Sequence, residues 1–521
     1  MLADPPNIDG STRANRSLPE EVSKGDFPGE GSADLPTRRA GLEQEFFLVD
    51  RRGVLSNQAD PFLRRCREAA KAEGLDPGCF EAECVKNLVE ITTPPSSGLL
   101  DLAGNYLNNL ELALRVASEL GLALYPLGTY PLPVSPVVRD DPGYAIQAST
   151  IGGGRFSHVG RCAGAHLHLE LPACTVWPDM KSALDAPLAA QEELLGLYNL
   201  ATALDPALVA LTRSCPFYEG RVEGVAARTA HYRGILGFEG LYKDLREVGS
   251  LSAYAMRVED LVDQQRAHYR AWFAAMDLAG VERRHFAQAG GNLHRASWNP
   301  VRLSHHGTIE IRSMDSNYPE MVLAFCALIQ GAAERVRREH LEVRPSRGVL
   351  TLEPDGGLLR VPIFSYLGGE LLAAAVTRGV EDQRVEAYLD SFVGFASPYL
   401  KQPELVEPLI SSGSYETTES EVLASFLSMG ASVTRGQGLS LVQEACRRLS
   451  EQVSSLRRSY DEKLQKYAGD GGAENVVSIR DAPTVCAGSQ PGHAADHHYG
   501  LRGASAGDWT IEATSTKGEL L

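Results

Sequence analysis

Apolar and charged residues alternate along four short segments of the chain, and this alternation predicts β-strands that are buried on one side. The segments are GLEQEFFLVD from Gly41, KNLVEITTPP from Lys86, AGAHLHLELP from Ala163 and GTIEIRSMD from Gly307. In each segment the apolar residues point to one side, where helices can cover them, and the charged residues point to the other. The pattern therefore predicts a sheet with one unusually polar face.

Apolar residues recur at helical spacing between and after these strands. The first predicted helix follows Pro95, with Ser97 as its N-cap. Further helices are predicted over 185–213, over 257–277, from Pro319 onward and through most of 381–468. The glycine-rich stretch 151–158 is interpreted as a flexible loop. Together these elements predict an α+β fold in which helices pack against a mainly antiparallel sheet.

The two ends of the chain differ in composition from the middle. Residues 1–37 carry five prolines and few apolar side chains, and residues 469–521 are rich in glycine, alanine, serine and aspartate. Chains of this composition bury too little apolar surface to fold, so both ends are predicted to be disordered. The residues between them, 38–468, are predicted to form one domain.

Charge and cysteine content narrow the class of protein. The chain has 50 lysines and arginines against 67 aspartates and glutamates, a formal net charge of −17, which disfavours binding to nucleic acid or to an anionic membrane. Its nine cysteines form no CxxC pair, which argues against a disulfide framework or a zinc knuckle and predicts a cytoplasmic protein. The longest apolar stretches, such as 321–329, fall short of the roughly 20 residues that span a bilayer, so no membrane segment is expected.

The polar faces of the four predicted strands carry an unusual set of side chains. They are Glu43 and Glu45, then Glu90 and Thr92, then His166, His168 and Glu170, then Thr308, Glu310 and Arg312. A face exposed to solvent is one explanation, but such faces usually carry threonine, lysine, serine and glutamine. Four glutamates on one sheet face would repel one another unless a cation lies among them.

The residue types on this face suit divalent cations and phosphate. Carboxylate oxygens favour Mg²⁺ or Mn²⁺ over zinc, and the planar guanidinium of Arg312 suits a phosphate or a carboxylate. Carboxylates, divalent cations and an arginine are together what phosphoryl transfer requires. The usual nucleotide motifs, GxxxxGK[ST] and GxGxxG after a strand, do not occur.

Six motifs resemble, in the same order, those of glutamate–cysteine ligase family 2. They are GLEQEFFLVD, LVEITTPP, GTYPLP, GAHLHLELP, SCPFYEGR and GTIEIRSMD, and the resemblance covers roughly residues 38–340. The family comprises ATP-dependent carboxylate–amine ligases with a catalytic domain related to glutamine synthetase. The resemblance implies a curved antiparallel sheet whose charged face binds ligands, in one catalytic domain over 38–468 with a helical C-terminal part.

The resemblance also implies a set of metal and nucleotide ligands. The positions that match metal-binding carboxylates of the family are Glu43, Glu45, Glu90 and Glu310. His166 matches a histidine that contacts metal or nucleotide, and His168 completes the GxHxH pattern. The implied cofactors are ATP and Mg²⁺, with Mn²⁺ as an alternative ion.

Arginines are implied to contact the anionic groups of the substrates. Arg312 matches the arginine that contacts the transferred phosphate, and we expect it to act in catalysis with Glu45 and Glu310. Arg221 and Arg228, in and after SCPFYEGR, are expected to contact a substrate carboxylate.

The implied reaction joins glutamate to an amine at the expense of ATP. The γ-carboxylate is phosphorylated and cysteine displaces the phosphate, which gives γ-glutamylcysteine, ADP and phosphate. Small molecules are thus the expected partners, and the oligomeric state is left open. Three alternatives remain: the same chemistry with another amine, a metal-dependent amidohydrolase built on the His-x-His pair, and a non-catalytic relative that binds nucleotide or amino acid.

Overall fold

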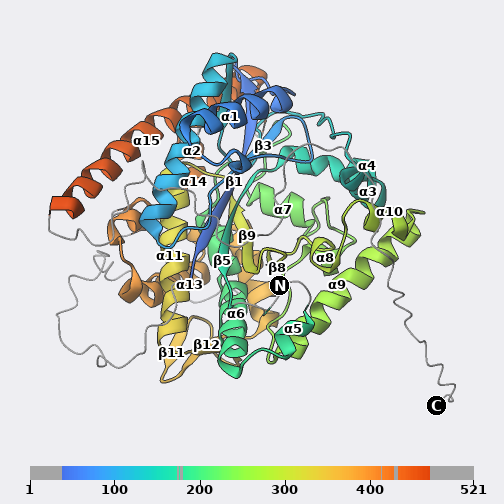
Figure 1. Ribbon diagram of the computed structural model, residues 1–521, viewed down its shortest axis with the longest axis vertical. Coiled ribbons are helices and arrows are strands. Elements are labelled where there is room, and N and C mark those ends of the chain that lie inside the picture. The colour runs from blue at the N-terminus through green and yellow to red at the C-terminus, as the bar shows by residue number, and fades with distance from the viewer. Residues whose placement is uncertain (1–37, 173–174, 176–179, 412–413, 427–431, 470–521) are drawn as a thin grey trace, which may run out of the picture. The chain divides into compact units, whose positions relative to one another are not determined.

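A computed structural model describes residues 38–172, 175, 180–411, 414–426 and 432–469. The predictions of disorder for residues 1–37 and for 469–521 fall outside these residues, apart from Gly469, which ends a helix. The predicted α+β class is confirmed, because helices pack against an antiparallel sheet whose strands differ in length (Figure 1).

The central sheet contains all four predicted strands as direct neighbours. They are β3 (Leu88–Thr92), β1 (Ala40–Asp50), β5 (Gly164–Glu170) and β9 (Thr308–Asp315), in that spatial order. Three further strands complete the sheet: β2 (Phe80–Ala82) beside β3, β8 (Val301–Ser304) beside β9, and β4 (Leu122–Tyr125), which pairs with β1. All of these pairings are antiparallel, so short connections and long helical crossovers bring distant motifs side by side.

Three long helices pack around the sheet and fix its apolar side. They are α2 (Leu99–Glu119), α6 (Leu188–Leu211) and α11 (Pro319–Arg338); α2 contacts β1 and β3, α6 contacts β8 and β9, and α11 contacts both helices. Gln44 of β1 is fully buried, and its side chain accepts from Tyr106 of α2 and donates to Ser316. Since neighbours along a strand point to opposite sides, these bonds direct Glu43 and Glu45 away from α2.

The remaining helices and strands surround this core. The helices are α1 (Ala59–Glu73), α3 (Pro142–Ile151), α4 (Gly153–Phe156), α5 (Lys181–Leu184), α7 (Ala227–Arg233), α8 (Arg246–Gly249), α9 (Val258–Leu278), α10 (Arg283–Gln288), α12 (Leu372–Thr377), α13 (Gln383–Ala396), α14 (Thr418–Phe426) and α15 (Arg435–Gly469). The strands are β6 (Phe217–Tyr218), β7 (Arg221–Val222), β10 (Glu342–Ser346), β11 (Glu353–Asp355), β12 (Leu358–Pro362), β13 (Ile410–Ser411) and β14 (Ser414–Tyr415).

Several local predictions are corrected. The N-cap of α2 is Gly98 rather than Ser97, and no side chain caps the helix. The stretch 151–158 is not a loop, because α4 and a 3-10 turn occupy most of it. One helix among the described residues, α6, is long and apolar enough to cross a membrane by length and composition, and 94% of its most apolar window is buried inside the protein.

Candidate active site

Strand register brings the predicted charged residues together on one face of the sheet. Glu43 lies opposite His166 across β1 and β5, Glu45 lies opposite Glu90 across β1 and β3, and His168 lies opposite Glu310 across β5 and β9. These side chains, with that of Arg312, line a cavity of about 380 Å³. The alternation seen in the sequence thus produces a common site because the strands are neighbours.

His166 is the centre of this cavity. Its ring is 2% exposed, with Nδ1 3.2 Å from Glu43 Oε2 and Nε2 3.8 Å from Glu45 Oε1. Two groups of ligand atoms share this imidazole, Glu43–His166–Glu310 and Glu45–Glu90–His166, and the atoms of each group lie within 4.8 Å of one another. His166 Nε2 is buried and has no hydrogen-bond partner. A buried nitrogen without a partner has lost its hydrogen bond to water, and a bound metal ion would replace that contact. The His166 ring is therefore suited to be a metal ligand.

The carboxylates on the β1 and β3 side of the cavity repel one another. Burial, together with the charge of Glu83, raises the pKa of Glu45 to about 8. Burial and four neighbouring glutamates raise the pKa of Glu90 well above its ordinary range. Both shifts mean that the ionised forms lack compensating positive charge, which a divalent cation would supply.

The carboxylates of Glu43 in β1 and Glu310 in β9 are instead compensated by protein groups. Burial acts to raise the pKa of Glu43, but His168 and His166 outweigh it and hold that pKa well below its usual range. Burial likewise opposes ionisation of Glu310, whose pKa is nonetheless lowered by Arg302 and Arg312. The cavity therefore has an uncompensated side, with the carboxyl groups of Glu45 and Glu90, and a neutralised side, with those of Glu43 and Glu310.

Two further glutamates lie in the cavity that the sequence analysis did not identify. Glu81, in β2, lies opposite Glu90, and Glu83 follows the strand. Burial raises the pKa of Glu83, and burial with the charge of Glu43 raises that of Glu81 to about 7. Glu81 and Glu83 are two residues apart, as Glu43 and Glu45 are, and this spacing is the sequence feature from which they could have been predicted. A strand of only three residues gives too little alternation to stand out.

Arg302, which the sequence analysis did not identify as a site residue, also lines the cavity. It lies opposite Glu310 across β8 and β9, and its Nε donates to Glu310 Oε2 over 2.5 Å. Arg312 donates to the other oxygen of the same carboxylate, and its Nη1 is 3.4 Å from His166 Nδ1. Glu310 thus fixes two guanidinium groups at one end of the cavity.

The two arginines expected to contact substrate lie in different places. Arg228 of α7 is 5% exposed and donates to the Arg312 carbonyl over 3.4 and 3.5 Å, directly behind the cavity wall. Gly164 makes room for it, since a Cβ there would lie 2.1 Å from Arg228 Nη2. Arg221 of β7 is exposed and lines a separate cavity of about 660 Å³. The structure therefore brings Arg228, and not Arg221, close to the other predicted residues.

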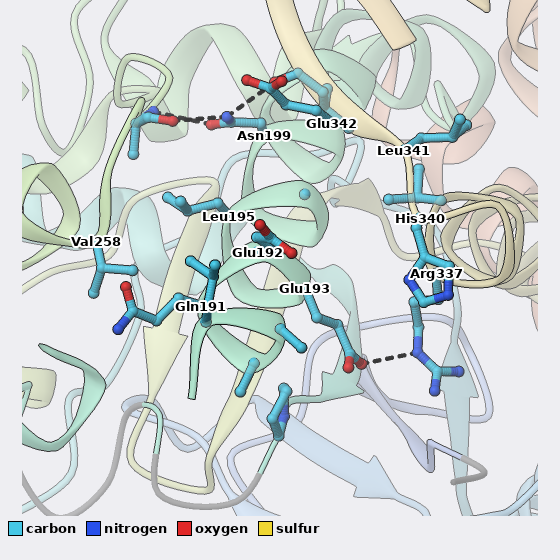
Figure 2. A pocket seen from close by; sticks show the side chains of 18 of the residues that line it. Gln191, Glu192, Glu193, Leu195, Asn199, Val258, Arg337, His340, Leu341 and Glu342 are labelled. Carbon is cyan, nitrogen blue, oxygen red and sulfur yellow. Dashed lines mark hydrogen bonds and ion pairs between the residues drawn. The ribbon is translucent and has the colours of Figure 1, made fainter. Parts of the chain in front are cut away.

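A larger cavity, of about 840 Å³, lies between α6, α9, β10 and α11 (Figure 2). Several of its polar side chains are engaged by other protein groups: Arg337 Nε donates to Glu193 Oε1 over 2.8 Å, and Asn199 donates to the backbone carbonyls of Ala255 and Val343. None of the predicted metal or phosphate ligands lines it. We therefore assign the chemistry to the smaller, charged cavity.

Comparison with known proteins identifies the chain first as an ATP-dependent ligase. The model of glutamate–cysteine ligase family 2 matches residues 39–353, and the chain belongs to this family. A putative glutamate–cysteine ligase 2-1 of Streptomyces avermitilis is 25% identical over 83% of this chain and 100% of its own length. A putative glutamate–cysteine ligase 2 of Pseudomonas paraeruginosa is 28% identical over 36% of this chain and 44% of its own. A crystal structure of glutamate–cysteine ligase from Francisella tularensis with AMP aligns with a TM-score of 0.42 at 11% identity, covering 85% of this chain and 96% of that one.

Proposed function

We propose that this ligase phosphorylates the γ-carboxylate of glutamate and couples it to the amine of cysteine. The observation that carries the proposal is that two pairs of glutamates converge on His166, beside the two arginines that bind Glu310. Family membership and the names of the relatives support the same chemistry.

The ligand set of the cavity fits Mg²⁺ better than zinc. Carboxylate oxygens outnumber imidazoles in both groups around His166, and Mg²⁺ prefers oxygen ligands. We propose Glu45 and Glu90 for one ion, and Glu43 and Glu310 for a second, with His166 between them. Bound Mg²⁺ would neutralise phosphate charge and so allow two anionic substrates to approach.

The same ligand set disfavours the amidohydrolase alternative. His168, the second histidine of the His-x-His pair, is engaged by Thr308 through Nδ1 at 2.8 Å and by Glu43 through Nε2 at 3.1 Å. Catalytic zinc sites instead use three protein ligands with histidines predominating.

In the proposed reaction the protein positions charge and supplies no nucleophile. An oxygen of the glutamate γ-carboxylate attacks the γ-phosphorus of ATP, and ADP leaves. The amine nitrogen of cysteine then attacks the acyl carbon, the bond to the phosphate oxygen breaks, and phosphate leaves as the amine loses a proton. Arg312, which donates to Glu310, would stabilise the negative charge that grows on the transferred phosphoryl group.

The experiment is an ADP-release assay with purified protein, ATP, Mg²⁺ and glutamate, in which a panel of amines is tested one at a time. We expect ADP release to require glutamate and to be fastest with cysteine, with γ-glutamylcysteine identified by mass. Equal rates with and without glutamate would exclude the proposed donor. A faster rate with another amine would keep the donor and replace cysteine as the acceptor.

A further inference from the structure

A separate charged cavity lies where strand β1 and helix α2 begin. Its volume is about 100 Å³, and its walls come from Arg39, from Gly98 at the start of α2, from α11 and from the segment that contains Lys401 and Gln402. It shares no lining residue with the carboxylate cavity. A space of this size admits a small ion or a short organic acid.

The N-terminus of α2 opens into this cavity without a side-chain cap. The helix has 21 residues, and its N-cap is Gly98, which has no side chain to accept from the first N–H groups. Such groups carry partial positive charge and attract anions. The acidic residue of the first turn, Asp101, is exposed and does not line the cavity.

Two glutamine side chains in the wall have buried polar atoms without hydrogen-bond partners. Gln402 is only 8% exposed, and its Oε1 has no hydrogen-bond partner. Gln330 is partly buried, and its Nε2 is a buried atom without a hydrogen-bond partner. Buried side-chain polar atoms normally have partners, so this pair points to a ligand that is absent here. One atom is an acceptor and the other a donor, so the ligand must both donate and accept.

The charge of the wall favours an anion. Five cationic side chains and two carboxylates line the cavity. Four of the cations have carboxylate partners: Arg39 pairs with Glu170, Arg338 with Glu334, and Arg38 and Arg337 with Glu193. Lys401 forms no ion pair with the residues that the structure describes. In a protein of net charge −17 this excess of positive charge is a local feature.

We propose that this cavity binds hydrogenphosphate. Its P–O⁻ oxygens would accept from the α2 N–H groups, from Gln330 Nε2 and from Lys401, and its P–OH would donate to Gln402 Oε1. Near neutral pH hydrogenphosphate has both a P–OH donor and P–O⁻ acceptors, whereas sulfate has acceptors alone. The inference is independent of the proposed reaction, because binding is measured without turnover.

The test is a calorimetric titration of the full chain with inorganic phosphate in the presence of EDTA. EDTA removes the divalent cations through which the carboxylate cavity would bind phosphate, and loss of the heat in variants of Lys401 and Gln402 assigns that heat to the cavity at α2. We expect one saturable site in the wild type and at least about tenfold weaker binding in Lys401→Ala and in Gln402→Glu, since a factor of ten corresponds to loss of about one charged contact. Lys71→Ala, an exposed lysine on α1, is the matched control and should bind as the wild type does.

Three results would overturn the proposal: no saturable heat in the wild type, unchanged affinity in both variants, or sulfate binding as tightly as phosphate. Lys401 is exposed, so Lys401→Ala is expected to fold whatever happens to Gln402→Glu, and thermal unfolding checks both variants. An inactive wild type with normal phosphate binding would count against the proposed ligase substrates alone.

Discussion

Glu43 and His166 lie directly opposite each other on β1 and β5, with Glu43 Oε2 3.2 Å from His166 Nδ1. Glu43 also contacts His168, through its other oxygen at 3.1 Å. A single carboxylate on β1 therefore joins two histidines of the neighbouring strand β5.

The stability of the metal-free protein should fall as the pH rises. The pKa of Glu45 is raised from 4.5 to about 8 in the folded protein, so its stabilising contribution is complete below the unfolded pKa and is lost as the pH passes the folded pKa. We expect the melting temperature in EDTA to decrease between about pH 5 and about pH 9, and Mg²⁺ to restore more of it at the upper end. Glu45→Gln should flatten the EDTA profile, and an unchanged slope in that variant would contradict the assignment.

Replacing Arg312 should remove turnover with little effect on folding. Arg312→Ala deletes the guanidinium that Glu310 holds in the cavity, and loss of one such charge-stabilising group typically costs about 10²–10³-fold in kcat. Arg312→Lys should recover only part of the rate, because lysine lacks the planar fork. Steady-state ADP release measures both, with Arg344→Ala on exposed β10 as the control; equal loss in the control would point to a general effect.

Glu83→Gln should weaken metal binding, although the residue was not predicted from the sequence. The carboxylate lies in the cavity beside Glu45 and Glu90, and its loss removes negative charge from the uncompensated side. We expect the Mg²⁺ concentration for half-maximal ADP release to rise about tenfold or more, in the range seen for residues that support metal sites. Glu68→Gln, exposed on α1, should leave it unchanged. If both variants resemble the wild type, Glu83 has no part in the metal site.

Gly164→Ala should damage the site through crowding. A Cβ at this position would lie 2.1 Å from Arg228 Nη2 and 3.0 Å from His166 Nε2, and the Gly164 N–H donates to Glu45 over 2.6 Å. Overpacking of this kind costs about 1–3 kcal/mol of folding free energy, and we expect a larger proportional loss of activity as the three side chains shift. Gly394→Ala in α13, where a Cβ meets nothing within 4 Å, is the control for thermal unfolding and ADP release. Wild-type activity in Gly164→Ala would show that the packing adjusts freely.

Long or strongly patterned elements could be predicted from the sequence. The four alternating strands, the helix that Pro319 opens and the helices predicted over 185–213 and 257–277 all appear in the structure. Short elements could not: β2 has three residues and β8 has four, too few for a pattern to emerge from the surrounding sequence. For this reason the sequence analysis did not predict that Glu83 and Arg302 line the cavity.

By itself the sequence determined which residues face away from the core, because the period of two along a strand separates Glu43 and Glu45 from Gln44 wherever the strand lies. It also carried the motifs that identify the family. Only the tertiary structure decided which charged faces meet, because strand order and register depend on contacts between residues far apart in the chain. His166 and Glu43 are 123 positions apart, and their pairing, like the separation of Arg221 from Arg228, follows from how the helices pack the strands together.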